Sequence, residues 1–535
     1  MTTSEIEPSR DGRADGRTPG RLGPWAWLAV ALAVVVRVAF LGDKPFWRDE
    51  AWVALLVGHP MAAVSGSRAV PFGFLLVTRA LAAAPGVAPE VAMRVVPLAC
   101  GIAAVPLLGR LAIALGSSRR AAIAAMWLAA GLQPLVYYSR ELKSYGIDFL
   151  LAILLPLLLL EGFLATDPRP PARRALPAAL AVTPWISFGG IFSACALLGW
   201  GWLAGWTRFD AARRRAWLLG TAAFALSFGA VFAFVLRAQA SDPWMHTYWT
   251  HRLLATGDAS LAWRTGTAAW RYGTIVVGFL FPVGAKAFLA LAAVGAVAGL
   301  DGRRLDAAGL FAATAAACIA ASVTDHYLIA QGRHLLFAAP ILVVWVAAGL
   351  DRISRSLPAT LRAVVVAGLP AVLAVAWSVR SIEHRVLPMA SNPSTYFRYD
   401  VLQDMPGLLA AATPLVHRGE PVLVTTKCSY PFQYYGRGRL AQAVFCEREC
   451  GDFHRVARRW LRQVRTRGWV LLTEEEPVPF GRLLAKEGFE HVEKASVRGL
   501  RLWEVRRPAT RGRPQGGGHR EPFPTRNPLL DDWPR

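Results

Sequence analysis

The chain has 535 residues, of which 54% are hydrophobic and 18% charged, and its formal net charge is +23. Runs such as 147–160 and 216–236 are too long and too apolar for ordinary core helices, since about 20 apolar residues match the thickness of a bilayer. These features exclude a soluble protein. We expect no nucleic-acid binding, because the arginines gather in short loops and in the C-terminal region without any motif that reads nucleic acid.

In chain order, residues 1–23 are polar and predict a disordered cytoplasmic tail without a signal-peptide cleavage site. The apolar runs that follow predict eleven membrane-spanning helices in a domain of residues 24–382, because helices satisfy their own backbone in lipid. The expected spans are 24–41, 92–115, 119–137, 145–165, 175–187, 189–206, 216–236, 274–300, 307–323, 333–350 and 360–380.

Short basic loops predict how these spans cross the membrane. If the N-terminus is cytoplasmic, every cytoplasmic loop is short and carries two or more arginines, as the positive-inside rule requires. These arginines are Arg119, Arg120, Arg173, Arg174, Arg213, Arg214, Arg215, Arg303, Arg304, Arg352 and Arg355. The eleventh span then leaves the chain outside. The excess of arginine over lysine and the many alanines are typical of a GC-rich bacterium, so we expect a bacterial inner (plasma) membrane.

The first outer loop, residues 42–89, contains a short apolar run at 70–84 that Arg79 interrupts. Counting this run as a span would place every later basic loop outside. We therefore expect a helix lying in the outer membrane interface there, and a second one at 50–57.

After the last span the composition changes, and residues 383–507 predict a small extracytoplasmic α/β domain. Strands are expected at 422–426, 469–473 and 500–505, and helices at 401–412, 453–464 and 480–486. Residues 508–535 are rich in Pro, Gly and Arg and predict a disordered tail. Cys428, Cys446 and Cys450 predict one disulfide and one remaining thiol. A metal site at Cys446, Cys450 and His454 is the alternative, although no fourth ligand is evident.

Two adjacent carboxylates, Asp49 and Glu50, lie between Trp47 and Trp52 just after the first span. They are either a solvated pair in an interfacial aromatic belt or a general base that takes a proton from an acceptor hydroxyl. Because neighbours on a helix point about 100° apart, one carboxylate can do chemistry while the other positions it or holds a cation. We predict both as catalytic residues.

A second polar group precedes the fourth expected span. On one continuous helix, Glu141, Tyr145 and Asp148 would share a face, and Arg140 and Lys143 another. Cations at the positive end of a helix are favourable where an anion such as phosphate is bound. Asp148 lies in an apolar run, where a charge is costly and usually functional. The alternative is an ion pair of Glu141 with Arg140 or Lys143 at the membrane edge.

Other residues are expected at the same depth. Arg333 and His334 lie at the outer start of the tenth span, and Arg94 at that of the second. Tyr248 and Trp249, in the loop after the seventh span, have ring faces that suit a sugar or the lipid interface alike. We predict that Arg140, Lys143, Arg333 and His334 bind a donor phosphate. The predicted substrate-binding residues are Glu141, Tyr145, Asp148, Arg94, Tyr248 and Trp249.

Three segments also carry a resemblance to a known family. They are Asp49-Glu50, the sequence Tyr-Tyr-Ser-Arg-Glu-Leu-Lys-Ser-Tyr at 137–145, and Gly-Arg-His-Leu-Leu-Phe-Ala-Ala-Pro at 332–340. As an ordered series over residues 24–350, they resemble glycosyltransferase family 39. This family belongs to the C-type (GT-C) membrane glycosyltransferases, which include protein mannosyltransferases and aminoarabinose transferases.

The resemblance implies a GT-C-like α-helical polytopic membrane domain and an enzyme that inverts the anomeric carbon. It implies a polyprenyl-phosphate-linked sugar as donor, an extracytoplasmic acceptor (lipid, glycan or protein), and Asp49 as the base. No cofactor is required, although a divalent cation near Asp49 or Glu50 is compatible with it. The sequence departs from the family at Val70-Pro71-Phe72, which has one proline where many members have two. The C-terminal domain also differs, so the acceptor is left open.

Two other functions remain open from the sequence alone. One is a transporter or flippase of lipid-linked sugars, although such proteins usually show inverted repeats and charges near mid-membrane. The other is a transferase-like assembly protein that has lost its chemistry.

Overall fold

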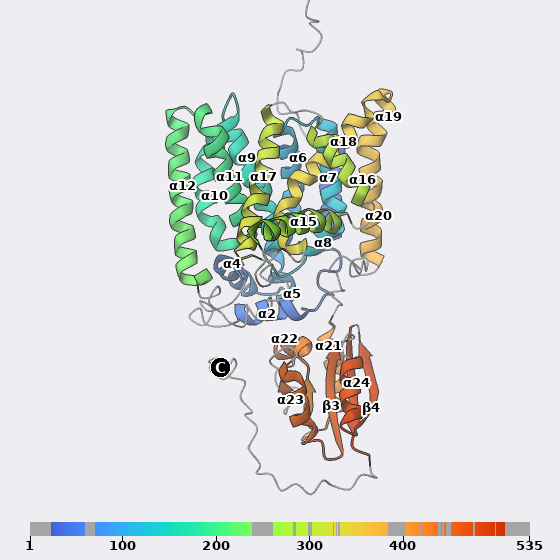
Figure 1. The fold of residues 1–535 in the computed structure, drawn as a ribbon. Helices are drawn as coiled ribbons and strands as arrows, with labels where there is room; N and C mark the ends of the chain where they lie inside the picture. Colours follow the sequence, from blue (N-terminus) through green and yellow to red (C-terminus); the bar gives the residue numbers. More distant parts are fainter. Residues whose placement is uncertain are drawn as a thin grey trace, which may run out of the picture.

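The structure, a computed structural model, describes residues 23–58, 70–237, 260–281, 285–297, 302–324, 326–327, 329, 332–383, 403–417, 419–436, 440, 443–445, 451–473, 477–497 and 499–508. Within these ranges the chain forms a bundle of apolar helices and a smaller C-terminal domain (Figure 1). This agrees with the predicted fold class.

The helices of the bundle follow the apolar runs of the sequence. The helices are α1 (Pro24–Val38), α2 (Arg48–Val57), α4 (Phe72–Ala82), α5 (Pro89–Ala92), α6 (Val95–Ala114), α7 (Arg119–Gly131), α8 (Gln133–Tyr138), α9 (Tyr145–Leu159), α10 (Pro170–Ile186), α11 (Phe188–Trp200), α12 (Ala211–Val231), α15 (Leu261–Leu280), α16 (Ala285–Val297), α17 (Gly302–Val323), α18 (Ala339–Ile353), α19 (Ala359–Ala363) and α20 (Leu369–Glu383). Short 3-10 or π-helical segments extend several of them, among them η5 (Gly332–Ala338), which leads into α18.

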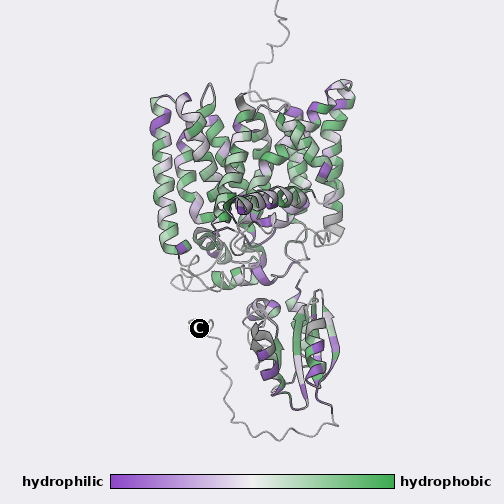
Figure 2. Ribbon diagram, viewed as in Figure 1, coloured by the Kyte–Doolittle hydropathy of each residue, from purple (hydrophilic) through white to green (hydrophobic). Residues whose placement is uncertain are grey.

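Seven helices among the described residues are long and apolar enough to cross a membrane. The helices of the bundle consist mostly of hydrophobic residues (Figure 2), as expected of helices that face lipid chains. Burial differs between them: 83% of the Gly332–Ser356 segment is buried, but only 22% of Ala211–Leu236. The segment containing α18 is therefore central and α12 peripheral. The number of eleven spans stays a prediction.

One predicted span is wrong. Residues 274–300 were expected to form a single helix, but α15 ends at Leu280 and a separate helix, α16, begins at Ala285. The sequence between them contains Pro282 and Gly284, which interrupt helices. α15 lies across the bundle (Figure 1) and carries Arg264 and Arg271 among apolar residues, a composition typical of an interfacial helix.

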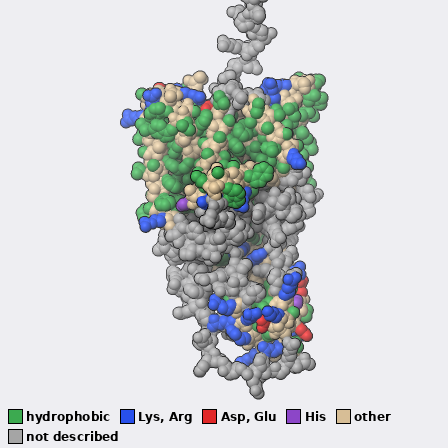
Figure 3. Space-filling view, viewed as in Figure 1, with side chains coloured by type: hydrophobic (Ala, Val, Ile, Leu, Met, Phe, Trp, Pro, Cys, Tyr) green, Lys and Arg blue, Asp and Glu red, His purple; other side chains and the backbone are tan. Residues whose placement is uncertain are grey.

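One end of the bundle is rich in basic side chains. Lysine and arginine side chains gather at the end that lies away from the C-terminal domain (Figure 3). The other end carries α2 and α4, the helices expected in the first outer loop, and lies next to the C-terminal domain (Figure 1).

The C-terminal domain contains a five-stranded sheet with the strand order β2-β1-β3-β5-β4. Its strands are β1 (Val422–Val424), β2 (Ala443–Phe445), β3 (Arg467–Thr473), β4 (Glu490–Val497) and β5 (Leu500–Arg506). The first three strands in space are parallel, β5 pairs antiparallel with β3, and β4 pairs antiparallel with β5. Helices α21 (Met405–Ala412) and α22 (Thr426–Tyr435) cover one face, and α23 (Gly451–Leu461) and α24 (Pro477–Lys486) the other.

Three predicted strands and three predicted helices are present in this domain. β2, β4 and α22 were not predicted. β4 is an edge strand with mostly exposed polar side chains, so it shows no alternation of apolar residues. Cys428 is buried in the core between α22 and β1, whereas Cys446 and Cys450 lie outside the described residues.

Candidate functional site

The two adjacent carboxylates lie in the first turn of α2. This helix begins at Arg48 after an extended Trp47, and the positive end of its dipole favours negative side chains there. Because successive residues point in different directions, the two carboxylates have different surroundings. The Glu50 side chain is completely buried, whereas the Asp49 side chain is 31% exposed.

Glu50 forms a buried ion pair with Arg94, the residue that precedes α6. Arg94 Nε and Nη2 donate to the two carboxylate oxygens at 2.7 and 2.6 Å, and neither side chain is exposed. The backbone N–H of Leu142 donates to Glu50 Oε1 at 2.8 Å, and Lys44 Nζ lies 3.9 Å from Oε2. Burial alone would raise the pKa of Glu50, but Arg94 and Lys44 hold it below its ordinary value.

This pair corrects two predictions. Glu50 was expected to be catalytic and Arg94 to bind substrate. Both side chains are buried, and the guanidinium of Arg94 occupies both carboxylate oxygens of Glu50. Arg94 Nη1 also donates to the Lys44 carbonyl at 2.6 Å. The pair therefore joins the first outer loop to the start of α6 and to the segment before α9.

Asp49 faces cations from two other parts of the chain. Arg333 Nη1, in η5, lies 3.5 Å from Asp49 Oδ2. Burial would raise the pKa of Asp49, but the positive charges of Lys143, Arg333, Arg48 and His334 hold it below its ordinary value. Asp49 is thus a charged, partly exposed carboxylate at neutral pH, as a proton acceptor must be.

Lys143 reaches this group from the segment 139–144, between α8 and α9. Its ammonium lies 4.9 Å from the centre of the Trp52 ring on α2, within the range of a cation–π interaction. Burial lowers the pKa of Lys143, and the charge of Asp49 opposes this shift. An aromatic side chain of α2 therefore holds Lys143 beside Asp49.

The predicted helix faces in this region are wrong. α9 begins only at Tyr145, so Glu141 and Lys143 lie before the helix. The N–H of Leu142 is bound by Glu50, and that of Lys143 by the Glu141 carbonyl at 2.8 Å. These two amides therefore cannot make the bonds that would continue a helix.

Arg140 also differs from expectation. Its Nη2 donates to the Ala39 carbonyl, at the end of α1, at 2.7 Å, and the residue is 8% exposed. Burial lowers the pKa of Arg140 to about 10, and the charge of Arg94 adds to this. Arg140 is thus held against α1 rather than beside Asp49, which corrects its predicted role in phosphate binding. Glu141, predicted to bind substrate, is completely buried.

Asp148 was predicted to bind substrate, but the structure gives it a neighbour in the bundle. Ser187 donates its hydroxyl to Asp148 Oδ1 at 2.5 Å and accepts the N–H of Gly190 as the cap of α11. A side chain at Gly189 would lie 2.8 Å from the carboxylate, so a glycine is needed for this approach. Asp148 therefore fixes the turn between α10 and α11.

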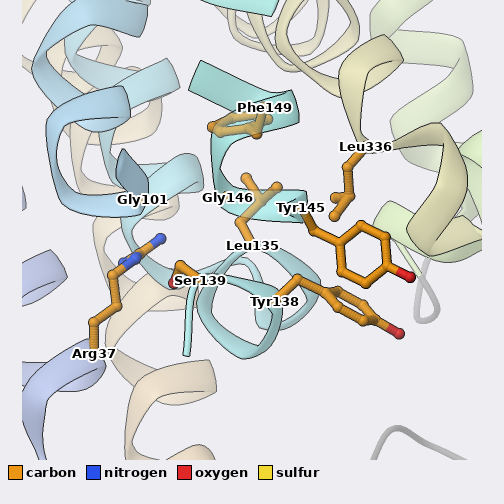
Figure 4. A pocket seen from close by; sticks show the side chains of 9 residues that line it. All are labelled: Arg37, Gly101, Leu135, Tyr138, Ser139, Tyr145, Gly146, Phe149 and Leu336. Carbon is orange, nitrogen blue, oxygen red and sulfur yellow. The ribbon is translucent and has the colours of Figure 1, made fainter. Parts of the chain in front are cut away.

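Tyr145 connects the cluster to a small cavity of about 10 Å³ behind it (Figure 4). Its ring lies 6.4 Å from that of His334 and 5.2 Å from that of Tyr138. Arg37, an arginine within α1, also lines this cavity and is 1% exposed.

Arg37 binds backbone carbonyls at the point where α7 ends and α8 begins. α7 ends at Gly131 and α8 begins at Gln133 with Pro134 as its next residue, and proline has no N–H to continue the helix. Arg37 donates to the carbonyls of Ala130 and Ala129 at 2.9 and 3.0 Å. It thereby satisfies oxygens that the break leaves without helical partners.

The structure brings together four of the predicted residues: Asp49, Lys143, Arg333 and His334. Tyr248 and Trp249 lie outside the described residues. Arg37 was not among the predicted residues, although an arginine inside a membrane span is itself a signal of an important role.

A metal has no evident set of ligands in the described part of the chain, where no three His, Cys, Asp or Glu side chains gather. Asp49 is surrounded by cations and Glu50 is occupied by Arg94.

Comparison with known proteins identifies the fold. No family model and no curated protein match the chain. Among solved structures, ArnT from Cupriavidus metallidurans bound to undecaprenyl phosphate matches with a TM-score of 0.53 and 14% identity, covering 92% of this chain and 99% of that one. Apo ArnT matches with a TM-score of 0.54 and 14% identity, covering 90% and 97%. An oligosaccharyltransferase from Archaeoglobus fulgidus with Zn and sulfate gives a TM-score of 0.48 and 11% identity, covering 89% and 72%.

The likeness to ArnT extends over nearly the whole of both chains. This protein therefore has the fold of a GT-C membrane glycosyltransferase, as the resemblance of its motifs implied. The identity is low, and the likeness shows the fold alone.

Proposed function

We propose that this protein is a membrane glycosyltransferase that moves a sugar from a polyprenyl-phosphate carrier to an extracytoplasmic acceptor. The observation that carries the proposal is the position of Asp49, a partly exposed carboxylate 3.5 Å from Arg333. A base and a cation in contact are what sugar transfer from a phosphate requires, because one group must accept a proton while another stabilises the departing phosphate.

In the proposed reaction, the acceptor hydroxyl gives its proton to Asp49 as its oxygen bonds to the anomeric carbon. The bond from this carbon to the phosphate oxygen breaks, and its electron pair leaves with the polyprenyl phosphate. Attack from the side opposite the leaving group inverts the anomeric carbon. The proton on Asp49 is then released to water, which returns the carboxylate for the next cycle.

The cations around Asp49 suit the charge change in this step. The phosphate gains one negative charge when the sugar leaves, so Lys143, Arg333 and His334 stabilise the transition state more than the bound donor. The donor phosphate also neutralises part of the positive field that holds the pKa of Asp49 low. Donor binding thereby makes Asp49 a stronger base. Arg140 and Glu50 have no direct role in this scheme.

The fold and the loops support the choice of substrate and location. ArnT, which has the same fold, has been solved with undecaprenyl phosphate, a lipid of the class proposed here. The basic loops lie at the bundle end away from the C-terminal domain (Figure 3). By the positive-inside rule, we place that end in the cytoplasm, and α2 and the C-terminal domain on the outer side of a bacterial inner membrane.

Purified protein incubated with labelled polyprenyl-phosphate sugars and membrane extract tests the proposal. A panel of hexosyl and pentosyl donors is needed, with label followed into acceptor and free polyprenyl phosphate measured as the second product. We expect both products to form together. Movement of intact donor across a vesicle membrane without cleavage would instead indicate a flippase, and neither event would indicate a protein without chemistry.

A further inference from the structure

The C-terminal domain contacts the bundle at the helix that carries Asp49. We propose that Tyr435 and Gln403 of this domain are positioning residues, which hold the backbone at the start of α2 so that Asp49 stays beside Arg333. This inference rests on the proposed role of Asp49 as the base.

Two hydrogen bonds join the domain to this backbone. The N–H of Phe46 donates to the Tyr435 hydroxyl at 2.8 Å, and the N–H of Arg48 donates to Gln403 Oε1 at 3.0 Å. The acceptors lie 389 and 355 positions further along the chain. They bracket Trp47 and end one residue before Asp49, so they fix the backbone from which the carboxylate projects.

α2 needs such a partner because it lacks a cap of its own. The first N–H groups of a helix have no partner within it and are usually bound by a side chain at the N-cap. The N-cap residue here is Trp47, and no side chain of α2 caps the helix. Gln403 accepts the N–H of Arg48, the first of the N–H groups that have no partner within the helix.

The same segment is held from the opposite side by the bundle. Arg94 donates to the carbonyls of Lys44 and Pro45 at 2.6 and 3.3 Å, and its guanidinium lies 4.8 Å from the centre of the Phe46 ring. The ring of Tyr434, next to Tyr435 in α22, lies 5.3 Å from that of Phe46 in an edge-on arrangement. The start of α2 is thus clamped between the bundle and the domain.

This clamp explains why a small domain outside the bundle matters for transfer. The bundle holds α2 through the Glu50–Arg94 pair and holds the carbonyls of Lys44 and Pro45, but the N–H groups of Phe46 and Arg48 are bound by the C-terminal domain. The contacts from Tyr435 and Gln403 restrict that freedom. A shift of about 1 Å in the position of a reacting group can lower a rate about a hundredfold, so loosening the clamp should lower kcat more than donor affinity.

The test compares three variants of the full-length protein with the wild type. Tyr435→Phe removes one acceptor, Gln403→Leu removes the other at similar volume, and Gln403→Glu keeps an acceptor oxygen. Thr413→Ala is the matched control, because it removes a hydrogen bond of α21 to the Leu409 carbonyl, away from α2. Amide hydrogen exchange of residues 45–52, measured without substrate, reports on the clamp directly.

We expect exchange at Phe46 and Arg48 to become about tenfold faster in Tyr435→Phe and Gln403→Leu. In the same variants kcat should fall about tenfold, with the KM for donor changed less than twofold. The acidic limb of the kcat profile should move to higher pH, because Asp49 moves away from the cations that face it: Arg48, Lys143, Arg333 and His334. Gln403→Glu should stay within about threefold of the wild type, and Thr413→Ala should match it.

Two results would overturn the inference. Faster exchange with an unchanged kcat would show that the contacts only pack the domain, and unchanged exchange would show that they do not restrain α2. Failure of the proposed function is distinguishable from both outcomes. In that case the wild type would transfer no sugar, or Asp49→Asn would transfer it at the full rate, whatever the exchange at Phe46 and Arg48.

Discussion

Replacing Glu50 with alanine should destabilise the protein strongly, because it leaves Arg94 buried without its carboxylate. Both side chains are completely buried and joined by two short hydrogen bonds. Removing one partner of such a pair costs about 3–5 kcal/mol. The N–H of Leu142 also loses its acceptor. For a chain of this length we expect the unfolding midpoint to fall by roughly 3–5 °C.

A double-mutant cycle measured by thermal unfolding of purified protein separates this ion pair from general damage. Glu50→Ala and Arg94→Ala should each be destabilising, and the double variant should be far less unstable than the sum of the two. Asp43→Asn is the matched control, since Asp43 is an exposed carboxylate in the same loop. Additive effects, or a Glu50→Ala variant as stable as the control, would refute the role assigned to this pair.

Three further predictions concern the cluster and the bundle. Arg333→Ala should weaken binding of polyprenyl phosphate at least tenfold by titration, whereas folded Arg140→Ala should bind it normally, because of these two arginines Arg333 lies beside Asp49 and Arg140 is held against α1. The reverse result would reassign the phosphate site. The pKa of Asp49 in the protein without donor lies below its ordinary value, so the acidic limb of kcat/KM should lie below the pH at which an ordinary aspartate titrates. Arg333→Ala should move this limb to higher pH, and a limb unmoved by that change would contradict the assigned cause. Arg37→Leu leaves the carbonyls at 129–130 without their donors. The loss should lower the free energy of unfolding by about 1–3 kcal/mol for each oxygen, measured from the unfolding midpoint. An unchanged midpoint would show that these carbonyls find other donors.

Much of the fold followed from apolar runs and basic loops. Both signals can be read from short stretches of sequence. A span in lipid must be a long apolar helix, and the loops on the cytoplasmic side carry an excess of basic residues. The prediction of one helix at residues 274–300 was wrong, because the apolar run continues through Pro282 and Gly284. A new helix begins at Ala285. The proline and glycine therefore determine where the helix ends, although the hydropathy continues through them.

The candidate site was predicted in part. Asp49, Lys143 and Arg333 were expected together because each lies near the same end of a predicted span. Arg140 and Glu141 were misplaced because the reasoning assumed one continuous helix. That helix is prevented by Glu50, which takes the N–H of Leu142 from 92 positions away. A contact at such a distance in the chain leaves no pattern in the local sequence.

The clamp on α2 shows the same limit. Gln403 and Tyr435 are ordinary polar residues in a segment that was read only as a separate domain. Their importance comes from the acceptors they offer to Phe46 and Arg48. One signal was present, because Trp47 precedes α2 at the N-cap position and its side chain accepts no bond from the helix, so the first N–H groups need partners elsewhere.

The most direct measurement is the initial rate of sugar transfer from a labelled polyprenyl-phosphate donor by the wild type and by Asp49→Asn, with Asp43→Asn as the control. Our account predicts that Asp49→Asn folds and binds polyprenyl phosphate like the wild type, yet transfers sugar about 10²–10⁴ times more slowly. Transfer at the wild-type rate by folded Asp49→Asn would contradict the account.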